Sequence, residues 1–231
     1  MKSIYAKQPE QKAFELVEPG NYMARCYSMI QLGTHVSEYA GKQTKRERVR
    51  ITWELPTELK KEGEYTGKPF AIGEEFTLSM SDMGNLRPML ESWRGKAFTE
   101  EEAQSFDITK VLEIPCLLNV IHKTSKDGKK TFAIIQSVSP LPKGMTCPAQ
   151  VNETFILTTE DFGGSEFSKL PEFIQKRIMD SLEYKGENYI APVEDDEVPN
   201  DPWGGKGYKD IVNNKPVDSS DDAIARALDI K

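Results

Sequence analysis

The segment 46-RERVRITWEL-55 alternates charged and apolar side chains with the period of two that is typical of a β-strand. Its apolar face consists of Val49, Ile51, Trp53 and Leu55. Arg46, Arg48 and Arg50 fall on the opposite face. A row of guanidinium groups neutralises phosphates and releases the counterions condensed around a nucleic acid. The segment therefore predicts a strand that buries one face in a core and offers the other to an anionic partner.

A second basic stretch runs from Lys123 to Lys130, where four lysines accompany one acidic residue, Asp127. Asp127-Gly128 is a strong signal for a hairpin turn, so these lysines are expected around a hairpin tip. The whole chain is nevertheless acidic, with a net charge of −7. Five acidic residues and no basic one lie between Ala191 and Asp201. Charge that is segregated in this way indicates charged partners.

The order of the expected elements predicts the fold class. Hydrophobic periodicity predicts strands over 21–33, 46–55, 74–80, 115–123 and 131–138. It predicts helices over 82–93, with Pro88 near the start or at a kink, and over 99–106, where Thr99 and Glu102 match a capping box. A mainly β protein with a helical insertion between the third and fourth of five strands has the connectivity of the OB-fold, a small partly open barrel.

The rest of the chain is expected to form appendages of this barrel. Residues 1–19 are interpreted as a lead-in and 20–190 as the OB-fold domain. Within that domain, 139–150 is expected to be a connector, 153–159 a further strand and 171–184 a C-terminal helix packed on the barrel. Residues 191–231 are polar and rich in proline and glycine, which predicts an acidic, disordered tail.

In an OB-fold, oligonucleotides lie on the surface of strands 2 and 3 between the loops that join strands 1–2 and 4–5. Both basic stretches are expected at that cleft, with the first loop over 34–45. Tyr27, Tyr39 and Phe76 are the candidates for stacking on unpaired bases, which favours single strands over duplexes. The predicted nucleic-acid-binding residues are Arg25, Tyr27, Tyr39, Lys42, Lys45, Arg46, Arg48, Arg50, Phe76, Lys123, Lys126, Lys129 and Lys130. Taken alone, the arginines of the first stretch also fit a solvated strand face, and the lysines of the second also fit a turn that they keep soluble.

The sequence offers no constellation for catalysis, metal binding or a cofactor. His35 and His122 lack partners at ligand spacing, and Cys26, Cys116 and Cys147 follow no metal motif. No apolar run reaches the length of a membrane helix, and the N-terminus lacks the apolar core of a secretory signal. We therefore expect no membrane association, and a cytoplasmic protein with reduced thiols.

Four segments together resemble small phage-encoded single-stranded DNA-binding proteins with an OB-fold: 20-GNYMARCYSMIQLG-33, 51-ITWEL-55, 79-SMSDMGNLRPMLESWRGKAFTEEEAQSFDI-108 and 115-PCLLNVIH-122. The resemblance implies a replication or recombination accessory protein that coats single-stranded DNA in the host cytoplasm during phage growth. The chain departs from the resemblance at Glu113, where glycine is expected before a strand. It also ends in Lys231 rather than the acidic-aromatic tip of bacterial single-strand binders.

The leading hypothesis is a non-enzymatic protein that coats single-stranded DNA with little sequence preference. Its acidic segment 194–201 would compete with DNA for the basic cleft or recruit replication and recombination proteins. The alternative is a protein-interaction or virion-associated scaffold whose basic face meets an acidic protein surface. RNA as the ligand stays open, because phosphate contacts and stacking do not sense the 2′-hydroxyl. The sequence does not determine the oligomeric state.

Overall fold

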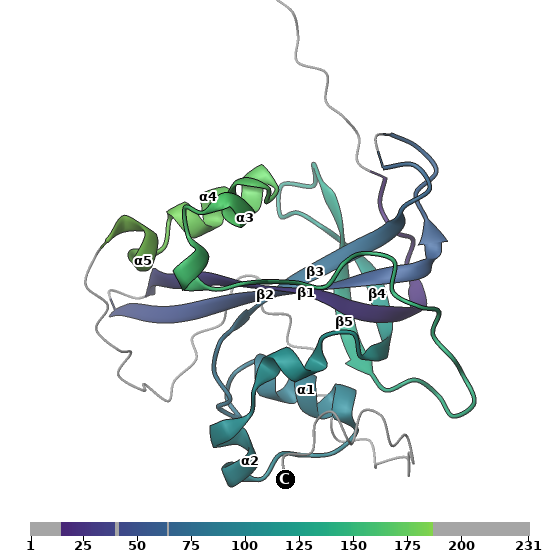
Figure 1. Ribbon diagram of the computed structural model, residues 1–231, viewed down its shortest axis with the longest axis horizontal. Helices are drawn as coiled ribbons and strands as arrows, with labels where there is room; N and C mark the ends of the chain where they lie inside the picture. The colour runs from purple at the N-terminus through teal and green to yellow at the C-terminus, as the bar shows by residue number, and fades with distance from the viewer. Residues whose placement is uncertain (1–14, 40–41, 64, 187–231) are drawn as a thin grey trace, which may run out of the picture.

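The computed structural model describes residues 15–39, 42–63 and 65–186 of the chain. A mainly antiparallel sheet of six strands dominates it, with helices on both sides of the long β1–β2 ribbon (Figure 1). The strands are β1 (Gly20–Tyr39), β2 (Lys42–Leu59), β3 (Pro69–Thr77), β4 (Pro115–Thr124), β5 (Thr131–Ser139) and β6 (Phe155–Leu157). Strand order is β3-β2-β1-β4-β5, and β6 joins β1 in parallel. The expected mainly β class with a helical insertion is thereby confirmed.

The six-stranded sheet is not closed into a barrel. Strands β3 and β5 stand at the two ends of the strand order, and no ladder joins them within the described residues. The two end strands nevertheless approach each other, because Gly73 of β3 and Ala133 of β5 line the same recess. The sheet therefore curls toward closure and leaves a seam at which the backbone groups are not paired with each other.

The register of β1 and β2 decides which side chains face the core. All four apolar residues predicted on β2, Val49 through Leu55, are completely buried, which confirms the alternation read from the sequence. Two irregularities in β1, between Cys26 and Ser28 and between Gln31 and Gly33, shift the side chains by one position. Cys26 and Met29 therefore both face the main core, whereas Ile30 and Leu32 face the other side of the sheet.

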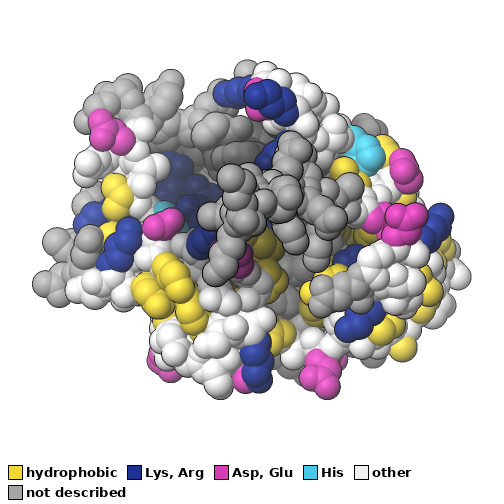
Figure 2. All heavy atoms as spheres, turned by 90° about the horizontal axis from the view of Figure 1, so that it is seen from above, with side chains coloured by type: hydrophobic (Ala, Val, Ile, Leu, Met, Phe, Trp, Pro, Cys, Tyr) yellow, Lys and Arg dark blue, Asp and Glu magenta, His cyan; other side chains and the backbone are white. Residues whose placement is uncertain are grey.

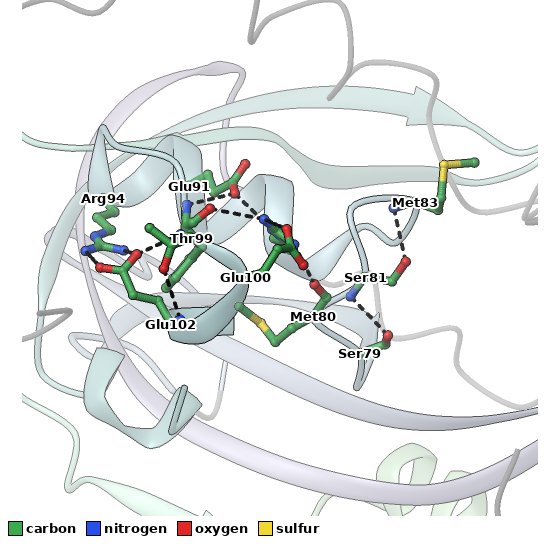
Figure 3. Close-up of polar contacts among 11 residues, drawn as sticks. Ser79, Met80, Ser81, Met83, Glu91, Arg94, Thr99, Glu100 and Glu102 are labelled. Atoms are coloured by element: carbon green, nitrogen blue, oxygen red, sulfur yellow. Dashed lines mark hydrogen bonds and ion pairs between the residues drawn. The ribbon is translucent and has the colours of Figure 1, made fainter. Parts of the chain in front are cut away.

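Helices α1 (Leu86–Arg94) and α2 (Glu100–Ser105) and the short 3₁₀ helix η1 (Ile108–Val111) form the insertion between β3 and β4. Leu86, Met89, Leu90 and Trp93 are fully buried, as the spacing predicts. The Thr99 capping box is confirmed, since its hydroxyl accepts from the Glu102 amide at 3.2 Å. The Glu102 carboxylate also accepts two hydrogen bonds from the Arg94 guanidinium, at 2.9 and 3.0 Å (Figure 3). These Arg94 contacts lower the pKa of Glu102 to about 2.

A second layer covers part of the opposite face of the sheet (Figure 1). It contains η2 (Thr159–Asp161), α3 (Ser165–Ser168), α4 (Glu172–Met179) and α5 (Leu182–Lys185). Ile174 and Ile178 pack with Ile30 and Leu32 of β1 in a cluster of their own. The expected helix over 171–184 is thus two helices, because Ser181 leaves the helical path and caps α5 through the amide of Tyr184.

Several boundaries differ from those read from the sequence. The expected loop over 34–45 is largely part of the β1–β2 ladder, which pairs Val36 with Lys45 and Tyr39 with Lys42. The expected connector over 139–150 holds no regular element after Ser139. The predicted tail, 191–231, lies outside the described residues, as does most of the predicted lead-in. Within the part of the chain that is described, no helix is both long and apolar enough to cross a bilayer.

Candidate functional site

Arg46, Arg48 and Arg50 lie on the face of β2 that is turned away from the main core, and we call them the basic row. Their partners on β1 are His35, Gly33 and Ile30, in that order. Residues two apart on a strand share a face at a spacing of about 7 Å. None of the three arginines is fully buried. On the face that carries α3–α5, Lys and Arg side chains gather in a hollow (Figure 2).

Arg50 occupies the most enclosed position of the basic row. Its guanidinium carbon lies 5.4 Å from the centroid of the Phe173 ring, in the geometry of a cation–π contact. Desolvation by burial lowers the pKa of Arg50 below its ordinary value, although Glu75 acts in the opposite direction. In residues 15–39, 42–63 and 65–186, no hydrogen bond or ion pair engages this guanidinium. A half-buried cation with unused donors is suited to an incoming anion.

Gly73 of β3 makes room for this guanidinium. A Cβ atom at residue 73 would stand 2.8 Å from Nη2 of Arg50 and 2.8 Å from Oγ1 of Thr52. The backbone at Gly73 is not in the left-handed region, so the requirement is one of space rather than of φ. The glycine therefore leaves the space that the Arg50 guanidinium occupies.

Helix α4 contributes two residues that the sequence analysis did not assign to the site. Phe173 is 59% exposed and stands beside Arg50, while the next residue, Ile174, is buried. Arg177 donates from Nε to Glu75 on β3 at 3.2 Å. Its positive charge also faces His35 and, after burial, is the largest influence that lowers the pKa of that imidazole. The helix thus borders the basic row with an exposed ring and another cation.

The lysines of the β4–β5 hairpin approach the same face. Lys123, Lys126, Lys129 and Lys130 are all exposed, and none forms an ion pair with a described residue. Asp127 fixes the turn by accepting from the Ser125 hydroxyl and the Lys129 amide. Just beyond this turn, Ala133 lines a recess of about 200 Å³ together with Arg50 and Gly73. The root of the basic hairpin therefore adjoins the end of the basic row.

Phe132 is a second aromatic residue that the sequence analysis did not assign. It is 40% exposed and pairs with Lys123 across the β4–β5 ladder. Its position could have indicated a role at this face, since it lies two residues after Lys130, the last lysine of the hairpin. Tyr27, which was predicted, is half-buried and stands close enough to Arg50 and Glu54 for both charges to influence its pKa. Burial is the largest cause and raises the pKa of Tyr27.

Three predicted residues are not available to a ligand on this face. Phe76 is 1% exposed and packs edge-on against Trp53 in the main core, so it presents no ring to a ligand. Arg25 donates to the carbonyls of Glu113, Cys147 and Pro148, and its guanidinium therefore fastens the 147–148 segment to the sheet. Lys45 alternates with Arg46 and falls on the opposite side of the strand. The side chains of Tyr39 and Lys42 lie outside the described residues.

Acidic groups on this face are engaged in bonds of their own. Glu54 is fully buried and accepts from the amides of Val151 and Asn152 at 2.6 and 2.8 Å. Glu183 accepts from the amide and hydroxyl of Thr34, both at 2.7 Å. Glu75 is the partner of Arg177. These contacts hold the carboxylates in fixed places, and Glu75 lies opposite Arg50 in the β2–β3 ladder.

A larger cavity of about 700 Å³ lies beside α2, on the other side of the β1–β2 ribbon from α4. Its lining mixes apolar side chains such as Met29 and Phe106 with hydroxyls and amides. Among the described residues, no group of His, Cys, Asp and Glu is arranged to hold a metal ion. The basic face is therefore the stronger candidate site.

No family model and no curated protein sequence matches this chain at a significant level, so the assignment of the site rests on its own residues.

Proposed function

We propose that this protein binds single-stranded DNA along the outer face of β2, without catalysing a reaction. The single observation that carries the proposal is Arg50, a desolvated guanidinium stacked against the exposed ring of Phe173 and lacking an acceptor in the described chain. An arginine and an aromatic ring side by side match the two parts of a nucleotide. The cation pairs with the phosphate, and the ring stacks on the base.

The neighbours of Arg50 extend this arrangement into a path. Arg46 and Arg48 continue it along β2, and the exposed hairpin lysines continue it past Ala133. Tyr27 and Phe132 supply further aromatic surface. A single strand exposes its base faces to such side chains, whereas a duplex keeps them stacked inside. Stacking of this kind accepts any base, so the proposed binding has little sequence preference.

The proposal extends to the fold and the biological role. Strand order β3-β2-β1-β4-β5, an insertion of helices between β3 and β4, and end strands that approach each other support an OB-fold with an open β3/β5 seam. The resemblance to phage-encoded single-strand binders supports a role in phage replication or recombination. Partners recruited by the acidic segment 194–201 would belong to the same process.

Titration of a fluorescent thymidine oligomer at low and high salt tests the proposal. We expect binding at 50 mM salt, with a logarithmic salt slope of about −0.7 for each phosphate that is neutralised. Duplex DNA and RNA of the same length serve as competitors. Binding that is absent at 50 mM salt, or equally tight for the duplex, would contradict the proposal. Saturation by an acidic protein in place of DNA would favour the scaffold alternative.

Gly73→Ala tests the place of Arg50 in this path. The new Cβ would displace the guanidinium from its position beside Phe173. We expect oligomer affinity to fall about 3- to 10-fold, the effect of about one weakened phosphate contact, while the urea midpoint changes little. The matched control is a double-mutant cycle, in which Gly73→Ala adds nothing to Arg50→Gln. Additive losses of affinity in the double mutant would show that the glycine acts elsewhere.

A further inference from the structure

The turn between β2 and β3 presents a second aromatic residue among cations, at a distance from the basic row. Tyr65 is 51% exposed. The ammonium nitrogens of Lys60 and Lys68 lie 4.9 and 5.8 Å from the centroid of its ring. Neither lysine forms an ion pair with a described carboxylate. The sequence analysis assigned no role to these residues.

Backbone hydrogen bonds stabilise the turn between β2 and β3. The Lys60 amide donates to the Lys68 carbonyl, and the Gly67 amide donates to the Lys60 carbonyl, both at 2.9 Å. The Lys68 amide donates to the Tyr65 carbonyl at 3.1 Å. Gly67 takes a φ of 79°, the left-handed conformation that closes such turns at least cost in a glycine. These backbone bonds set Lys60 and Lys68 beside Tyr65, whose exposed ring lies within 6 Å of both ammonium groups.

The turn is connected to the basic row through the N-terminal segment. The Glu15 carboxylate accepts from the amides of Lys61 and Glu62 at 2.9 and 3.3 Å. Glu15 also lines the recess that contains Arg50, Gly73 and Ala133. One recess thus reaches from the end of the basic row to the residue that anchors the turn.

We propose that Tyr65, with Lys60 and Lys68, is a second nucleotide subsite, at which a base stacks on the ring and the lysines pair with the flanking phosphates. This inference rests on the proposed function and adds the direction in which the strand runs, from Arg46 past Arg50 toward the β2–β3 turn. Lys68 stands seven positions before Glu75, the β3 partner of Arg50, or roughly 23 Å at the rise of a strand. At about 3.4 Å or more per nucleotide, that span holds roughly seven nucleotides at most.

The test compares oligomers that cover one subsite or both. For Tyr65→Ala we expect the affinity for a fifteen-nucleotide thymidine oligomer to fall about tenfold, as for the loss of one stacked base. The affinity for a four-nucleotide oligomer, held at the basic row, should not change. The number of nucleotides occluded per protein on long polythymidine should also fall. Tyr65→Phe keeps the ring and should restore all three values.

The outcomes separate this inference from the proposed function. If the unmodified protein binds neither oligomer, the proposed function fails and the subsite with it. If the unmodified protein binds the long oligomer and Tyr65→Ala binds it equally well, the second subsite is wrong and the proposed function stands. Equal losses for both oligomer lengths would also overturn the second subsite, because a residue outside the basic row should not affect the shorter one. Urea unfolding of each variant verifies that this exposed position leaves the fold intact.

Discussion

Replacing Arg46, Arg48 and Arg50 together by glutamine is expected to lower the affinity for a thymidine oligomer at least about 100-fold at 50 mM salt. The logarithmic salt slope should become less steep by about 2, because each lost phosphate contact removes about 0.7 from it. Glutamine keeps much of the side-chain volume, so the contact with Phe173 loses its charge without leaving a large gap. Fluorescence anisotropy over a range of salt concentrations gives both values.

The control variant removes the same number of charges from elsewhere on the surface. Lys96, Lys110 and Lys143 are exposed. The first two lie in the helical insertion between β3 and β4, and Lys143 follows β5. Glutamine at these three positions changes the net charge equally but leaves the basic row intact. If both triple variants lose affinity to the same extent, binding depends on overall charge, and the basic row is not the site.

The second large effect is expected at Gly33, where α5 meets β1. Gly33 has a φ of 77°, and a Cβ atom there would lie 2.5 Å from Cβ of Ser181 and 2.7 Å from the Glu183 carboxylate. Alanine would therefore strain the backbone and also push α5 from the sheet, breaking the bonds between Glu183 and Thr34. We expect Gly33→Ala to lower the free energy of unfolding by about 3 kcal/mol or more, measured by urea denaturation.

Gly67→Ala is the matched control for this prediction. Gly67 has nearly the same φ, 79°, but no atom lies within 4 Å of the position of a new Cβ. Its substitution therefore reports the backbone strain alone, about 1 kcal/mol. Equal losses of stability at the two glycines would show that the packing of α5 against β1 contributes nothing. Hydrogen exchange that is faster in α4 and α5 than in β2 would locate the loosened region.

Local signals in the sequence were sufficient for most of the elements, although not for where each of them ends. The alternation of β2 predicts both its buried face and the basic row, because a period of two assigns each side chain to a face. The Thr99 capping box and the Asp127-Gly128 turn are also decided within a few residues. At Glu113, where glycine was expected, φ is 68°, in the left-handed region. The backbone there keeps the glycine conformation, and the Thr154 hydroxyl donates to the Glu113 carboxylate at 2.6 Å.

Long-range packing was not predictable in the same way. Apolar residues in 171–184 predict a helix, but not that α4 would lie across the outer face of the sheet and leave Phe173 exposed beside Arg50. Arg25 is basic and lies on the same strand as Tyr27, yet its partners are carbonyls more than eighty positions away along the chain. Phe76 is a different case, because its alternation with Leu78 and Met80 already indicated a buried face.

Ultraviolet cross-linking of a bromodeoxyuridine-containing single strand, followed by mass spectrometry of the peptides, tests most directly whether the basic row, α4 and the β4–β5 hairpin surround one ligand. We predict adducts on peptides that contain Tyr27, Phe173 and Phe132, and their loss in the triple glutamine variant of the basic row. Adducts confined to peptides of α1 and α2, on the opposite side of the β1–β2 ribbon, would contradict the proposed site.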